Sequence, residues 1–161
     1  MTTLAHDSIP PAARRATPAH DTVREGLGLG MRVGVATWLW LAILDAVAGT
    51  PFRTIATLGG ATTFTIIHFV LCAAYGLAII GIVHASMRTP SVMFAMIFFT
   101  ILFHGAFAML TAFVAQLGLG GGAWMRFLAG NSIAAAITFT YVARRHSLRA
   151  IFHAAEADLN E

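Results

Sequence analysis

Long apolar segments separated by short breaks dominate the chain. Four of them contain 20 to 26 residues each and cover residues 29–48, 62–87, 92–117 and 123–143. At about 1.5 Å of rise per helical residue, each is long enough to cross a hydrocarbon core of about 30 Å. Because no alternation of apolar and polar residues indicates barrel strands, the pattern predicts four transmembrane α-helices.

The breaks between the apolar segments consist of residues that end helices. They are the tripeptides Gly49-Thr50-Pro51 and Arg88-Thr89-Pro90 and the glycine-rich run over residues 118–122. Proline and glycine interrupt helices, and short connections require antiparallel neighbours. We therefore expect an all-α polytopic membrane protein whose residues 23–143 form an antiparallel four-transmembrane-helix bundle.

The two ends of the chain are more polar than the bundle. Residues 1–22 contain prolines and few large apolar side chains, which predicts a disordered tail. Residues 144–161 carry apolar side chains at helical spacing between charged ones, which predicts a short amphipathic helix on the membrane surface. This helix is either a docking surface for a partner or a simple membrane anchor.

Composition agrees with a membrane protein. Hydrophobic residues make up 58% of the chain and charged residues only 11%, whereas about a quarter of a typical soluble domain is charged. This composition excludes a disordered chain, a disulfide scaffold and a typical soluble enzyme. We expect the protein to be embedded in the lipid bilayer. The single cysteine, Cys72, lies in an apolar segment and reads as a small core residue.

The basic residues predict the orientation. All ten are arginines, and alternating helices place eight of them on one side: Arg14, Arg15, Arg24, Arg32, Arg88, Arg144, Arg145 and Arg149. Only Arg53 and Arg126 fall on the other side. By the positive-inside rule both termini are cytoplasmic. The arginines follow the ends of apolar segments and form no solvated patch, so a nucleic-acid partner is not expected.

Four polar residues fall at similar depth near the outer ends of the predicted helices. They are Asp45, His68, Arg126 and Asn131. Ionisable side chains are costly in hydrocarbon, so they are candidates for function. We expect an Asp45–Arg126 ion pair with the histidine and the asparagine hydrogen-bonded around it. The cluster is either a small binding or proton-responsive site or a structural clamp that sets the helix register.

His104 lies near the middle of the third segment, and counting along the hairpin places Tyr75 opposite it. The two side chains are expected to share a hydrogen bond. Ligation of a haem or chlorophyll is the alternative, because several phenylalanines surround His104.

A haem held by two histidines requires both at one depth. The depths of His68, His84 and His104 differ by more than about 10 Å, so no pair within this hairpin fits. His84 and His146 both lie near the cytoplasmic edge and could pair, although both are expected to extend toward the interface. No HxxxH, HExxH or CxxC spacing occurs. The prediction is therefore no cofactor and no metal.

Glycines recur every four residues at the start of the first segment, at Gly26, Gly30 and Gly34. Small residues at this spacing allow two helices to approach closely. The stripe is either a contact in a homo- or hetero-oligomer or a packing surface within the bundle.

Three stretches resemble a group of bacterial four-helix membrane proteins without an assigned activity. They are WLWLAILDAVAGTPFRT (Trp38–Thr54), IHF (Ile67–Phe69) and GNSIAAA (Gly130–Ala136), which look like the LDxxxGxP, HF and GN segments of that group. The resemblance spans roughly residues 34–145 and includes Asp45, His68 and Asn131. It implies a four-helix protein of the bacterial inner membrane and supplies no reaction.

The sequence contains no nucleophile elbow, phosphate-binding loop or paired carboxylates within the apolar segments. We therefore expect a protein that is not an enzyme but a structural or accessory subunit of a larger bacterial membrane complex. A small oligomeric transporter or channel is the alternative, and a haem-binding electron-transfer protein is less favoured.

Overall fold

The computed structural model describes residues 19–87, 89, 92–120 and 122–146. This part of the chain is all-helical, and none of its residues forms a β-strand. The elements are α1 (Ala19–Val47), α2 (Arg53–Thr57), α3 (Ala61–Ser86), α4 (Val92–Leu119) and α5 (Ala123–Arg145).

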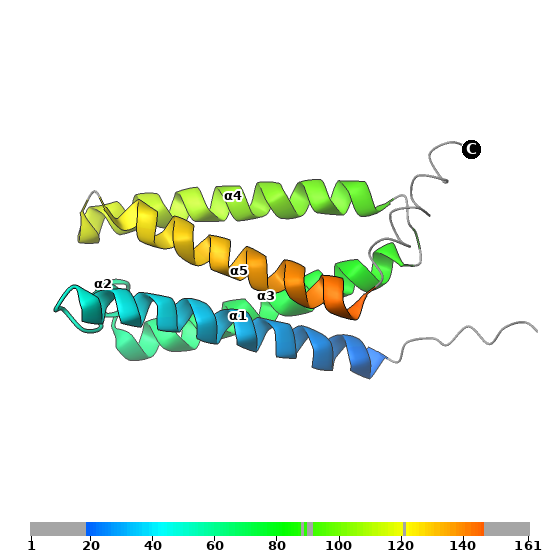
Figure 1. Cartoon of the computed structure of the whole chain (residues 1–161), viewed down its shortest axis with the longest axis horizontal. Coiled ribbons are helices and arrows are strands. Elements are labelled where there is room, and N and C mark those ends of the chain that lie inside the picture. Colours follow the sequence, from blue (N-terminus) through cyan, green and yellow to red (C-terminus); the bar gives the residue numbers. More distant parts are fainter. Residues whose placement is uncertain (1–18, 88, 90–91, 121, 147–161) are drawn as a thin grey trace, which may run out of the picture.

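The four long helices lie along the long axis of the molecule, and the short α2 closes one end (Figure 1). α1 packs most extensively against α3, while α5 lies between α1 and α4 and contacts both. α3 and α4 touch only slightly although they follow one another in the chain. The start of α1 and the ends of α3 and α5 therefore share one end of the bundle, opposite α2.

The helix boundaries agree with the apolar segments to within a few residues, except at the start of the bundle. α1 begins at Ala19, ten residues before the apolar segment, so the prediction of a disordered tail over 1–22 is wrong for residues 19–22. The rest of that tail lies outside the described residues. So does nearly all of the predicted amphipathic helix over 144–161, of which only residues 144–146 are described, and α5 runs through Arg145.

Buried apolar side chains form two clusters. One joins α1, α3 and α5 through Leu29, Val33, Ile79, Ile80, Ala134 and Val142. The other joins α1, α2 and α5 through Leu41, Ile55, Ala123 and Phe127. Many other large apolar side chains along the long helices are exposed. A soluble protein rarely exposes so much contiguous apolar surface, so this surface fits a lipid environment.

Two described helices are long and apolar enough to cross a membrane. They are Asp21–Val47, with a mean hydropathy of 1.6, and Ala61–Ser86, with a mean hydropathy of 2.4. In the most apolar 18-residue stretch of each helix, only 28% and 17% of the residues, respectively, are buried inside the protein. The central helix of a soluble protein would be mostly buried, and these two are not.

The glycine stripe of α1 packs inside the bundle, directly on α3. A methyl group built on Gly26 would lie 2.7 Å from the Cα of Leu77, and one on Gly30 would lie 2.8 Å from the Cα of Ala73. Gly76 of α3 faces the backbone of the same two glycines. Because backbone meets backbone here, any side chain larger than hydrogen would force the helices apart.

Candidate functional site

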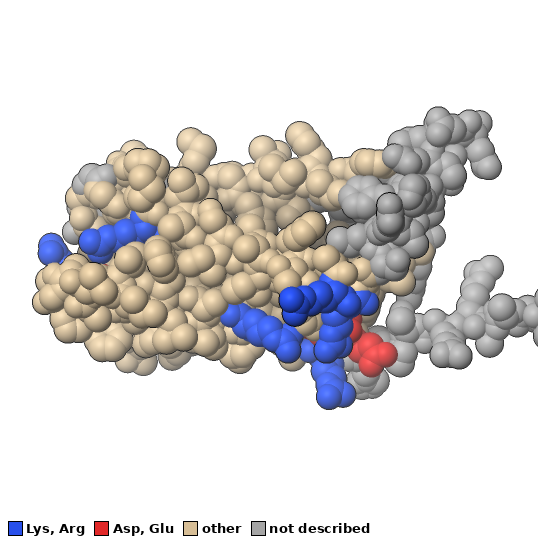
Figure 2. Space-filling model, in the orientation of Figure 1, with Lys and Arg blue, Asp and Glu red and all other residues tan. Residues whose placement is uncertain are grey.

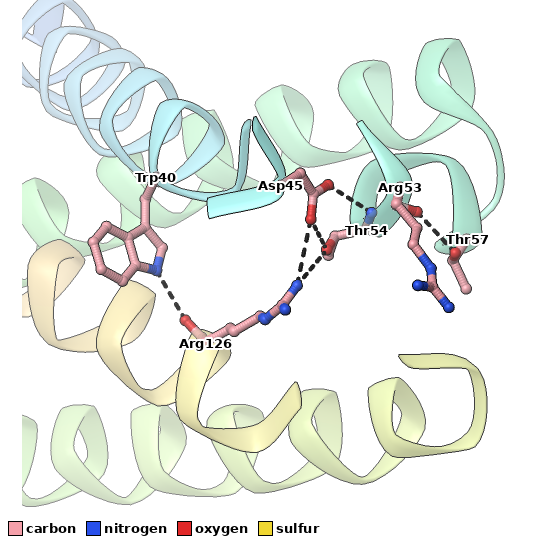
Figure 3. Close-up of polar contacts among 6 residues, drawn as sticks. All are labelled: Trp40, Asp45, Arg53, Thr54, Thr57 and Arg126. Carbon is pink, nitrogen blue, oxygen red and sulfur yellow. Dashed lines mark hydrogen bonds and ion pairs between the residues drawn. The ribbon is translucent and has the colours of Figure 1, made fainter. Parts of the chain in front are cut away.

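Asp45 in the last turns of α1 is completely buried, with an exposed fraction of 0%. Its Oδ2 accepts a hydrogen bond from the backbone N–H of Thr54 at 2.6 Å, and its Oδ1 accepts one from the Thr54 hydroxyl at 2.6 Å (Figure 3). Thr54 is also buried, with 1% exposed. The pair therefore ties the end of α1 to the following segment through charge-assisted hydrogen bonds.

This contact explains why the short helix α2 forms between α1 and α3. The first N–H groups of a helix have no partner within it, and the residue before α2, Phe52, makes no side-chain cap. The carboxylate of Asp45 supplies the missing acceptor from the preceding helix. Phe52 takes a left-handed conformation (φ 60°), which turns the chain from the end of α1 into α2.

Arg126 of α5 completes this group. Its Nη1 lies 3.4 Å from Asp45 Oδ1 and 3.5 Å from Thr54 Oγ1, and 36% of its side chain is exposed. The backbone carbonyl of the same residue accepts a 3.0 Å hydrogen bond from the Trp40 indole (Figure 3). The Asp45–Arg126 pair expected from the sequence is thus present, and α5 is joined to α1 at two points.

The other two members of the predicted cluster form their hydrogen bonds with groups outside the ion pair. His68 Nε2–H donates to the carbonyl of Gly34 at 3.1 Å and lies 3.2 Å from the Thr37 hydroxyl. Asn131 donates to the carbonyl of Phe127 in its own helix at 3.0 Å. The expectation that both are hydrogen-bonded to the ion pair is therefore wrong. Thr54 takes that position because the turn after α1 folds back on Asp45.

Tyr75 and His104 do meet, although not through the expected hydrogen bond. Their rings touch edge to face, with centroids 5.2 Å apart. The tyrosine hydroxyl instead shares a 2.9 Å hydrogen bond with Thr138 of α5. His104 Nδ1–H donates to the carbonyl of Thr100, one turn earlier in α4, at 2.8 Å.

A cavity of about 770 Å³ lies where α3 and α4 diverge, and α1 and α5 complete its walls. On α3 its lining runs from Phe64 to Ile82, a length of about 27 Å at 1.5 Å per residue. Ile67 and Leu71 line it and are also exposed, so the cavity opens at the surface of the bundle. Its volume is in the usual range of small-molecule sites.

The described walls of the cavity are chiefly apolar. The polar side chains in the lining include His68, Tyr75, His104, Arg126 and Asn131. Each of them already has a hydrogen bond to another part of the protein. The wall therefore offers mainly apolar contact, with a few polar side chains that are each held by at least one hydrogen bond within the protein.

A second polar cluster lies at the opposite end of the bundle from Asp45, where α1 begins and where α3 and α5 end. It contains Glu25, His84 and His146. Burial lowers the pKa of His146, against the opposing effect of the nearby Glu25 carboxylate, while His84 and Arg145 lower it further. The sequence showed only that the two histidines share a depth, because Glu25 is 59 residues from the nearer one.

Comparison of the chain with protein-family models, curated proteins and solved structures found no match. The resemblance of its short motifs to bacterial four-helix membrane proteins thus stays a prediction, and the case for function rests on the geometry above.

Proposed function

We propose that this chain is an integral protein of a bacterial inner membrane, with four membrane-spanning helices and both termini in the cytoplasm. We further propose that it is not an enzyme but an accessory subunit that holds a lipid acyl chain in the cavity between α3 and α4. The observation that carries the second proposal is the size and apolar lining of this laterally open cavity.

The distribution of charge supports the membrane placement. On the face shown in Figure 2, arginines lie at one end of the bundle and from about its middle toward the other end, and uncharged side chains cover most of the remaining surface. α3 and α4 contain no Asp, Glu, Lys or Arg at all. Two long helices without any charged side chain fit the hydrocarbon core of a bilayer, where charge is costly.

The shape of the cavity supports an acyl chain as its occupant. It extends about 27 Å along α3, close to the thickness of the hydrocarbon core that α3 would cross. Because its opening is lined by exposed apolar residues, lipid chains could enter it directly from the bilayer. A transported polar solute would need a continuous path of hydrogen-bonding groups, whereas the described lining is chiefly apolar, so the transporter alternative is less favoured.

Filling the cavity should displace this occupant. Ala78 is an exposed lining residue of α3, so Ala78→Phe would place a ring in the cavity at little cost in stability. We expect the wild-type protein, purified in mild detergent, to retain phospholipid that native mass spectrometry detects on the intact chain. The variant should retain at least about tenfold less, the effect of losing about 1.4 kcal/mol of binding free energy.

Ala136→Phe is the matched control, because Ala136 is exposed on α5 and does not line the cavity. It should retain lipid like the wild type. Equal retention by the two variants would show that the bound lipid covers the outer surface, and it would overturn the acyl-chain proposal.

The orientation can be measured separately. A green fluorescent protein fused after Glu161 should fluoresce in cells, since it folds in the bacterial cytoplasm and fails to do so when exported in unfolded form. Alkaline phosphatase inserted at Gly120, between α4 and α5, should be active, since it requires export. The reverse pair of results would overturn the placement of the termini.

A further inference from the structure

We propose that Glu25, His84 and His146 bind one divalent transition-metal ion, for which Zn²⁺ is the best fit, with water as a further ligand. This site is separate from the cavity. One ligand atom from each residue lies within 4.8 Å of the other two. Two imidazoles and one carboxylate form a ligand set that zinc uses where one coordination position stays open.

The distances within the cluster favour a metal over direct hydrogen bonds. Both Nε2 atoms face the same carboxylate oxygen, Oε2 of Glu25, at 3.5 Å from His84 and 3.6 Å from His146. An N–H···O hydrogen bond is usually about 2.7–3.2 Å long. Ligand atoms about 2.1 Å from a tetrahedral ion lie about 3.4 Å apart. The two separations thus match the edges of a zinc tetrahedron.

His146 provides an independent indication. Its side chain is only 9% exposed, and its Nε2 is buried without a hydrogen-bond partner in the part of the chain that the structure describes. A buried polar atom without a partner is costly, and most such atoms in proteins bond to something. This nitrogen lies 3.6 Å from Oε2 of Glu25, and its ring lies edge to face against the ring of His84, with centroids 5.3 Å apart. A metal ion there would satisfy it.

Neighbouring side chains orient the other two ligands. The Thr22 hydroxyl lies 2.7 Å from Nδ1 of His84, so it can accept the Nδ1–H and leave the Nε2 lone pair directed at Glu25. Arg145 donates to Oε1 of Glu25 at 3.3 Å, which leaves Oε2 for the metal. Hydrogen bonds of this kind fix the tautomer and rotation of metal ligands. The site joins the start of α1 to the ends of α3 and α5.

Direct metal binding is the test. The full chain is produced without a histidine tag, purified in detergent, stripped with chelator and dialysed against Zn²⁺. We expect one ion per chain by elemental analysis, and Co²⁺ in place of Zn²⁺ should give the intense visible absorption of a tetrahedral site. Zn²⁺ should also raise the melting temperature, since it binds the folded state.

The variants His84→Ala and His146→Ala should each weaken binding by more than about 100-fold, and Thr22→Val by about 10- to 100-fold. His104→Ala is the control, since this histidine lies in the cavity, and it should bind like the wild type. Circular dichroism checks that each variant folds, and Glu25→Gln, which keeps the side-chain size, replaces any variant that does not.

A wild-type chain that binds neither ion would overturn the proposal and leave a cluster of ion pairs. Binding that survives the loss of both histidines would overturn it too, because other groups would then hold the metal. The Ala78→Phe variant of the cavity should bind Zn²⁺ normally, so failure of the acyl-chain proposal would leave this result unchanged.

Discussion

Gly30→Ala is expected to destabilise the protein by about 3 kcal/mol, the upper part of the usual range for overpacking a close contact. The added methyl group would meet the carbonyl of Cys72 and lie 2.8 Å from the Cα of Ala73. Both are backbone atoms, which cannot rotate away, so α1 and α3 would have to separate. Unfolding of the purified protein by SDS in mixed micelles, followed by circular dichroism, measures the effect.

Gly28→Ala is the matched control, two residues away on the same helix. A methyl group there would meet only the end of the Arg32 side chain, at 4.0 Å. Since alanine has a higher helix propensity than glycine, this variant should be more stable than the wild type by about 0.5–1 kcal/mol. If the two variants unfold alike, the close approach of α1 and α3 through their backbones is wrong.

Asp45→Ala is expected to destabilise the protein by about 3–5 kcal/mol, because two buried donors each lose a charged acceptor at a cost of about 1–3 kcal/mol. The substitution leaves the Thr54 N–H and hydroxyl without their acceptor in a buried position. α2 should lose its order and expose Ile55, which is fully buried. The measurement is the same unfolding experiment, together with proteolysis between α1 and α3.

Two neighbours supply the comparison. Arg126→Gln should cost only about 1 kcal/mol, because its contact with Asp45 is 3.4 Å long and over a third of its side chain is exposed. Arg53→Ala should be close to neutral, because Arg53 is exposed and its guanidinium points away from the carboxylate (Figure 3). If Arg126→Gln lowers the stability as much as Asp45→Ala does, the ion pair, and not the hydrogen bonds to Thr54, stabilises this end of the bundle.

The sequence by itself predicted the long helices and two contacts between them, Asp45 with Arg126 and Tyr75 with His104. The length and ends of each helix can be predicted from its own apolar segment, because helix formation and hydrophobicity are local properties. Depth counting along the helices also placed Asp45 and Arg126 together, 81 residues apart in the chain, and the structure confirms that contact. The count worked because the rise per residue of a helix is constant.

Depth alone does not determine which way a side chain points around the helix axis. This direction decides which hydrogen-bond partners each of the other polar side chains has. It allowed His68 and Asn131 to join the ion pair, whereas the packing of α1 on α3 turns His68 toward Gly34. The sequence could not predict the hydrogen bonds from the turn after α1 either, since Thr54 meets Asp45 only after the chain reverses.

Only the tertiary structure assembled the two candidate sites. The cavity exists because α3 and α4 diverge while α5 fills the space beside α1. Glu25, His84 and His146 belong to three helices whose ends meet at one end of the bundle. Long-range packing sets these positions, and a one-dimensional pattern of apolar and polar residues carries the period of each helix but not its rotation against its neighbours.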